Sequence, residues 1–153
     1  IHNRGHQHGY EKFTSKQINS LKQLLKQLIQ LYKIDIKNIL GHSDIAPNRK
    51  TDPGEKFPWK LLAKNKIGFW HSLSNNLLKK NRKIKVNIKD KKIFINNLYK
   101  IGYSKNFIKK IDESYHLKSI IKAFQRRFRQ ELINGIIDKE CLLISKNLIE
   151  KYY

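Results

Sequence analysis

The sequence predicts an α/β segment up to about residue 74, followed by a basic linker and a small module of three helices. A strand–loop–helix pattern in the first 74 residues indicates the α/β segment. A Lys-Lys-Asn-Arg-Lys run at 79–83 marks a change in composition, and three amphipathic stripes follow it. A chain of 153 residues can bury one good core or two small ones. We therefore expect boundaries at 1–74, 75–88 and 89–153.

Residues 14–33 are predicted to form a helix. Thr14 and Gln17 have the spacing of a capping box, in which each side chain bonds the backbone of the other residue. Apolar residues then recur at intervals of three and four, which places them on one helical face. They are Ile18, Leu21, Leu24, Leu25, Leu28, Ile29 and Tyr32. Such a stripe indicates a helix that packs on the core.

Two short strands are predicted around this helix. Residues 1–5 are expected to end one strand, which continues into a loop rich in His and Gly. Residues 38–40 are expected to form a second strand that delivers His42 at its carboxyl end. A helix packed on such a strand is an α/β arrangement, with the site at the carboxyl edge of the sheet.

The candidate site lies in the loop that follows. His42, Lys50 and Asp52 place an imidazole, an ammonium and a carboxylate within eleven residues. Two prolines and a glycine in the same stretch exclude regular structure, and ordered loops often carry chemistry. His42 and Asp52 offer a nitrogen and an oxygen of the kinds that zinc accepts.

Residues 42–54 read His-Ser-Asp-Ile-Ala-Pro-Asn-Arg-Lys-Thr-Asp-Pro-Gly, and Phe-Pro-Trp follows at 57–59. This stretch closely resembles the second zinc-ligand block of the zinc-dependent N-acetylmuramoyl-L-alanine amidases (amidase type 2), whose domain is built on a mixed sheet. The resemblance implies that His42 and Asp52 bind zinc, and that Lys50 is catalytic and stabilises the oxyanion of the tetrahedral intermediate.

The resemblance also implies a reaction and a substrate. Zinc with three protein ligands and one open position lowers the pKa of bound water to roughly 7. The expected activity is hydrolysis, by this activated water, of the amide bond between N-acetylmuramic acid and L-alanine in peptidoglycan or muropeptides. The expected location is the bacterial cell envelope, in the periplasm.

The first five residues resemble the end of the family's glutamate-bearing strand. The catalytic glutamate would fall immediately before Ile1, and the first zinc histidine further upstream. We therefore expect this chain to lack both, and to be inactive by itself. His2 is a weak candidate for a replacement ligand, because alternation along a strand puts it on the same face as that glutamate. Trp59 is expected to be a packing anchor, with substrate stacking as the weaker alternative.

Three helices are predicted in the last part of the chain, over 89–101, 117–129 and 139–151. The first is expected to end at Gly102, and Asp138 is expected to cap the start of the last. Residues 123–128, with Asn134-Gly135 and Asp138, resemble the peptidoglycan-binding domain 1 family, as does Leu-x-x-x-Gly-Tyr at 98–103. A peptidoglycan-binding module is thus implied. A packing appendage without a ligand is the alternative.

The net charge of +21 favours anionic partners, although Lys, Ile and Asn share AT-rich codons that explain much of it. Two other functions therefore remain open: a catalytically inactive cell-wall-binding remnant and, ranked last, a basic nucleic-acid binder. Only residues 124–128 interleave aromatics with arginine, and these aromatics belong to the predicted buried stripe.

No apolar run approaches membrane-spanning length. The single cysteine, Cys141, excludes an intrachain disulfide and is expected to be packed. The oligomeric state stays open.

Overall fold

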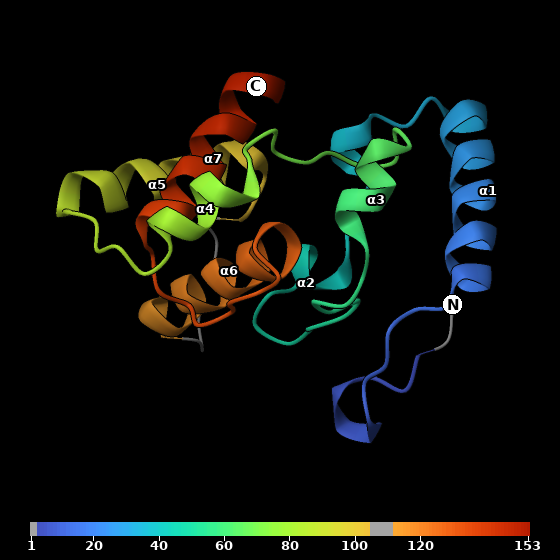
Figure 1. Cartoon of the computed structure of the whole chain (residues 1–153), viewed down its shortest axis with the longest axis horizontal. Coiled ribbons are helices and arrows are strands. Elements are labelled where there is room, and N and C mark those ends of the chain that lie inside the picture. The colour runs from blue at the N-terminus through green and yellow to red at the C-terminus, as the bar shows by residue number, and fades with distance from the viewer. Residues whose placement is uncertain (1–2, 105–111) are drawn as a thin grey trace.

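The computed structural model describes residues 3–104 and 112–153, and its regular structure in these ranges is helical (Figure 1). The helices are α1 (Ser15–Tyr32), α2 (His42–Ile45), α3 (Trp59–Lys64), α4 (Asn75–Asn81), α5 (Ile88–Ile101), α6 (Glu113–Phe128) and α7 (Lys139–Tyr152). Two 3-10 turns, η1 (His6–His8) and η2 (Ile36–Asn38), precede and follow α1.

The predicted α/β class is wrong, because the described ranges contain no strand and no sheet. Of the first predicted strand, residues 3–5 are irregular, and residues 1–2 lie outside the described ranges. The second predicted strand begins in η2, which the side chain of Asp35 caps by accepting from the Lys37 amide. Strand formation requires a partner for the backbone ladder, and short apolar runs do not show whether a partner exists.

The helix predictions are confirmed. Thr14 and Gln17 form the expected capping box at the start of α1. The helices α5, α6 and α7 occupy the three ranges predicted for the last part of the chain to within a few residues at their ends. Gly102 ends α5 with a φ of 113°, a left-handed conformation that glycine adopts without steric cost. The side chain of Asp138 caps α7 by accepting from the Cys141 amide.

Two hydrophobic clusters form the interior. The larger one gathers residues from α4 to α7, which lie together on one side of the molecule in Figure 1. Its fully buried members are Phe94, Leu98, Ala123, Phe124, Cys141, Ile144 and Leu148. The smaller cluster joins α1 and α3 through Ile18, Phe57, Trp59, Leu62 and Ile67. Helix α1 stands at the opposite end from α5 in Figure 1, and Leu24 and Tyr32 of its apolar stripe remain exposed.

The predicted linker at 75–88 contains the helix α4, which packs on α7. Directly after α4, Arg82 donates two hydrogen bonds to the fully buried carboxylate of Glu140, at 2.7 and 2.8 Å. Next to this pair, Arg129 donates to Asp138 at 2.5 Å. The 75–88 segment is therefore held to the helices that follow it. The division of the chain into domains stays a prediction.

Candidate functional site

The candidate loop is closed on itself by backbone contacts. Gly41 precedes α2, and a Cβ atom there would lie 2.6 Å from Cδ of Pro53, so only glycine permits this close approach. One residue into α2, the Ser43 amide donates to the carbonyl oxygen of Asp52 at 2.9 Å. The start of α2 and the Asp52–Pro53 turn therefore lie against each other, although ten residues separate His42 from Asp52.

This closure brings His42 and Asp52 together. Nδ1 of His42 and Oδ2 of Asp52 lie within hydrogen-bonding distance. Both side chains reach solvent, with 73% of His42 and 56% of Asp52 exposed. An imidazole nitrogen and a carboxylate oxygen that lie next to each other and are open to solvent are suitable donors for a zinc ion.

The described residues offer two candidate protein ligands for a metal at this point. No cluster of three or more His, Cys, Asp or Glu side chains suited to a metal occurs in the described ranges. A catalytic zinc site takes three protein ligands and one open position. His2, the weak candidate for the third ligand, lies outside the described residues. The donor pair therefore fits zinc in its chemistry and makes up part of a site.

Lys50 does not line the same cavity as His42 and Asp52, the candidate ligand pair. Its amide donates to the Ala46 carbonyl at 2.9 Å, which closes the turn after α2. Its side chain is exposed, and it makes no ion pair with any residue that the structure describes. It lines a groove of about 270 Å³ between the loop and α6, together with Lys122 and Arg126. Two residues along the chain from Asp52, Lys50 is close to the pair in sequence but borders a different hollow.

A cavity of about 480 Å³ lies beside His42 and Asp52. Its wall is formed largely by apolar and aromatic side chains from α1, α3 and the segments that flank them: Tyr10, Phe13, Leu21, Leu25, Ile39, Phe57, Trp59 and Leu62. Trp59 lines this cavity but is only 5% exposed, and its ring packs against Phe57 at 4.8 Å between centroids. The ligand pair thus stands at the border between solvent and an apolar hollow.

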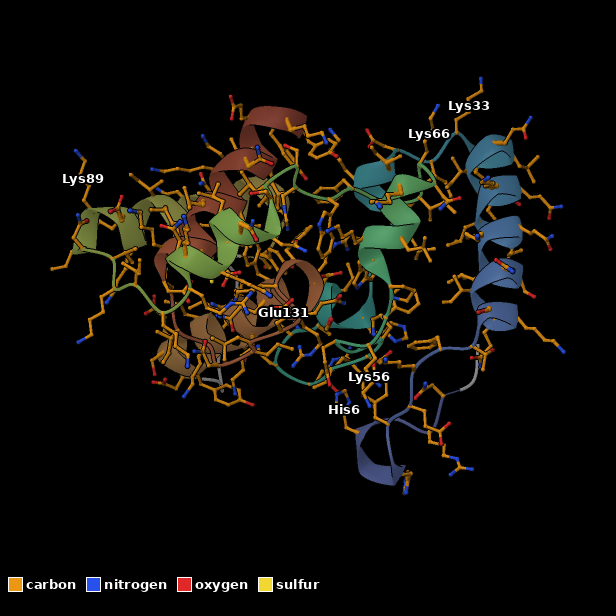
Figure 2. The ribbon with its side chains drawn as sticks, in the orientation of Figure 1. His6, Lys33, Lys56, Lys66, Lys89 and Glu131 are labelled. Atoms are coloured by element: carbon orange, nitrogen blue, oxygen red, sulfur yellow. The ribbon has the colours of Figure 1, made fainter. Side chains whose placement is uncertain are left out.

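Tyr10 holds the far end of the loop, a role that the sequence does not indicate. Its hydroxyl donates to the Pro53 carbonyl at 2.8 Å and accepts from the Lys56 amide at 2.9 Å. Burial raises the pKa of Tyr10, and nearby Glu55 raises it further. Figure 2 shows His6 and Lys56 close together at this corner, where His6 pairs with Glu55 at 2.9 Å. A tyrosine 43 residues from its partner leaves no signal in a local pattern.

Asp44 is the most enclosed charged group of the loop, with 5% of its side chain exposed. From the sequence we assign Asp44 and Arg49 structural roles as caps or a pair inside the loop. Asp44 does accept from the Gly41 amide, at 2.9 Å, but its ion pair is with Arg127 of α6. Tyr103 donates a further bond to the same carboxylate at 2.8 Å. Burial raises the pKa of Tyr103 well above its usual value, and the Asp44 charge adds to this shift.

The one segment suggestive of nucleic-acid binding is interior. Phe124 is fully buried, and Arg127 and Phe128 are 2% and 1% exposed. Aromatic stacking on bases requires accessible rings. No helix in the described part of the chain has the length and apolar character needed to cross a membrane.

Comparison with known proteins agrees with the loop's resemblance. Residues 1–55 match the family described as N-acetylmuramoyl-L-alanine amidase. The chain is 35% identical over 144 residues to the N-acetylmuramoyl-L-alanine amidase AmiD of Escherichia coli K12, covering 94% of this chain. It is 47% identical over 47 residues to the 1,6-anhydro-N-acetylmuramyl-L-alanine amidase AmpD of the same organism, covering 31% of this chain and 26% of AmpD. The predicted resemblance to this amidase family is confirmed.

The fold is also similar to a solved amidase. The complex of E. coli AmiD with the substrate anhydro-N-acetylmuramic acid-L-Ala-D-gamma-Glu-L-Lys superposes with a TM-score of 0.78 at 35% identity, and the match covers 94% of this chain and 55% of that one. The chain spans about half the length of AmiD, 51% by sequence. The similarity extends beyond residue 55 into the helical part, because both matches cover nearly the whole chain.

Proposed function

We propose that this chain, whose residues 1–55 match the N-acetylmuramoyl-L-alanine amidase family, forms part of a zinc-dependent amidase that cleaves the bond between N-acetylmuramic acid and L-alanine. The substrates are peptidoglycan or soluble muropeptides. The observation that carries the proposal is the contact between His42 and Asp52 in a loop that lies within the matched segment.

The chain's own residues have distinct parts in this proposal. His42 and Asp52 hold the metal, since they are exposed, adjacent and of the right donor types. Bound zinc supplies Lewis-acid polarisation and an acidic water. Lys50 offers a positive charge free of ion pairs with the described residues, and such a charge stabilises an oxyanion where it can reach one. The apolar wall beside the pair keeps one side of the site away from water, which strengthens electrostatic interactions.

The segment 89–153, which the sequence predicts to be a peptidoglycan-binding module, is proposed to contact the cell wall. The protein is proposed to work in the bacterial cell envelope, in the periplasm. A net charge of +21 favours polymers that carry carboxylates. Retention on purified sacculi, compared with retention on double-stranded DNA at the same moderate salt concentration, tests this proposal. Preferential retention on sacculi is expected. Stronger retention on DNA would contradict it.

A chimera tests the enzymatic proposal. The stretch of E. coli AmiD that aligns with this chain, 51% of AmiD, is replaced by this chain, and hydrolysis of anhydro-N-acetylmuramyl tripeptide is followed with added zinc. We expect the chimera to release the peptide and the chain alone to release none, because the described residues supply two of the three ligands.

Two outcomes would contradict the amidase proposal. One is a folded chimera that binds the muropeptide but does not cleave it, which would favour the inactive cell-wall-binding alternative. The other is hydrolysis that persists unchanged after His42→Ala and Asp52→Ala in the chimera. His8→Ala serves as the control, since His8 is exposed and does not line the cavity beside the ligand pair.

A further inference from the structure

We propose that Arg127 of α6 is a positioning residue for the candidate metal site, because it fixes the turn that carries His42. This inference rests on the proposed function in that it takes His42 as a metal ligand. Arg127 lies 85 residues from His42 along the chain, and its hydrogen bonds within the described ranges go to Asp44 and Ile39, not to His42 or Asp52. It acts through Asp44 and the backbone.

The guanidinium of Arg127 joins two points on either side of His42. Nη1 donates to Oδ2 of Asp44 at 2.7 Å, and Nη2 donates to the carbonyl oxygen of Ile39 at 2.9 Å. Asp44 Oδ2 in turn accepts from the Gly41 amide at 2.9 Å. The backbone is therefore held at 39 and 41 before His42, and at Asp44 after it.

This clamp lies in an enclosed environment. The side chains of Arg127 and Asp44 are 2% and 5% exposed. The guanidinium carbon lies 4.2 Å from the centroid of the Trp59 ring and 4.9 Å from that of Phe69. An ion pair away from water is screened little, and a planar guanidinium between aromatic rings has few alternative positions. The contacts therefore define one geometry for the turn.

The ligand itself remains accessible. His42 begins α2 and is 73% exposed, so its ring gains no rigidity from burial. Its orientation depends on the backbone that bears it, and metal sites lose affinity when such supporting contacts are removed. Tyr103 strengthens the clamp by donating to the other oxygen of Asp44. The helical part of the chain thereby contributes directly to the geometry of the loop.

Arg129 provides a matched control. It is also an arginine of the α6 C-terminus, is 1% exposed, and pairs with the 4% exposed carboxylate of Asp138 at 2.5 Å. In both arginines the Nε atom is buried without a hydrogen-bond partner. Unlike Arg127, however, Arg129 makes its ion pairs with residues at the start of α7, Asp138 and Glu140, and not with the loop. Loss of either arginine removes a buried ion pair, but only loss of Arg127 releases the turn.

The experiment compares Arg127→Gln, Arg127→Lys and Arg129→Gln in the full chain, under conditions where circular dichroism shows each to be folded. Amide hydrogen exchange at residues 41–46 is measured without metal. Zinc affinity is measured by competition with a chromophoric chelator, and the site geometry by the absorption spectrum of bound Co²⁺. Tyr103→Phe is the milder second variant if Arg127→Gln does not fold.

We expect Arg127→Gln to speed exchange at 41–46, to weaken zinc binding about 10- to 100-fold and to alter the cobalt spectrum. Arg127→Lys should lie between wild type and Arg127→Gln, since one ammonium cannot reproduce the two-pronged contact. Arg129→Gln should leave all three readouts unchanged. If Arg127→Gln folds, Tyr103→Phe should shift them in the same direction by less.

Equal exchange at 41–46 in the two glutamine variants would overturn the proposal. Faster exchange with unchanged zinc affinity and cobalt spectrum would overturn it as well, because Arg127 would then be purely structural. Absence of zinc binding in both the wild-type chain and the AmiD chimera would contradict the proposed function instead. The exchange comparison would still decide whether Arg127 orders the turn.

Discussion

The amide of Ser43 donates to the carbonyl oxygen of Asp52 at 2.9 Å, so the backbone beside one candidate ligand is tied directly to the other. The side chains of His42 and Asp52 meet at the same place. The pair is therefore preorganised by main-chain contacts, and a metal ion entering there does not have to draw two mobile segments together.

The first prediction concerns metal binding. His42→Ala and Asp52→Ala should each reduce the zinc stoichiometry or affinity of the chain, because each removes one of two donors at a shared point. Isothermal titration with zinc measures the effect. His8→Ala should bind zinc as the wild type does. Unchanged stoichiometry in either ligand variant would show that the loop is not a zinc site.

The second prediction separates the role of Lys50 from that of the ligands. In the AmiD chimera, Lys50→Ala should lower kcat by about 10²- to 10³-fold, the usual cost of losing one oxyanion donor, and leave zinc affinity unchanged. Steady-state kinetics and a zinc titration provide the two readouts. Lys89 is an exposed lysine on α5, far from the loop (Figure 2), and Lys89→Ala should not alter kcat. An unchanged kcat in Lys50→Ala would mean that Lys50 lines the groove beside α6 and takes no part in catalysis.

The third prediction is a pH dependence of stability caused by His71. Burial, and to a smaller extent the charge of nearby Lys60, lowers the pKa of His71 from 6.5 to about 4. Its Nδ1 atom is buried without a hydrogen-bond partner. Below pH 6.5 the unfolded chain therefore binds a proton that the folded chain does not bind until about pH 4. Stability should fall as the pH is lowered through this window, by up to about 3 kcal/mol, and His71 should add no further loss below it.

Urea unfolding at pH 7 and at pH 4.5 measures this dependence. His71→Gln removes the titrating group, so the variant should lose less stability than the wild type between these two pH values. The exposed His8 provides the comparison, and His8→Gln should lose as much stability as the wild type between pH 7 and pH 4.5. An equal loss of stability in His71→Gln and the wild type between these pH values would contradict the prediction that His71 causes the pH dependence.

The fourth prediction concerns the buried ion pair that holds the segment after α4. Glu140 is fully buried, and its carboxylate raises the pKa of Arg82. Glu140→Ala should lower the free energy of unfolding by about 3–5 kcal/mol, because it leaves Arg82 and the neighbouring Arg129 without their shared partner. Chemical denaturation measures the loss. Glu150→Ala, at an exposed position of α7, should change stability by less than about 0.5 kcal/mol.

The sequence by itself determined the local features of this protein. Thr14 and Gln17 predict the start of α1, Gly102 the end of α5, and Asp138 the start of α7, and all three are confirmed. Capping depends on side chains within three residues of the groups that they satisfy, so a local pattern contains the whole interaction. The contact between His42 and Asp52 likewise lies within one loop, and its family resemblance is visible in the same short stretch.

Only the tertiary structure decided the features that depend on distant partners. The predicted strand at 38–40 is absent from the described residues because pairing is a property of two segments, and the Ile39 carbonyl is taken by Arg127 instead. Asp44 pairs with Arg127, which is 83 residues away, and not with nearby Arg49. The pair forms because folding places α6 against the loop and buries both side chains. Charge patterns along a sequence show which groups are available, whereas folding alone determines which of them meet away from water.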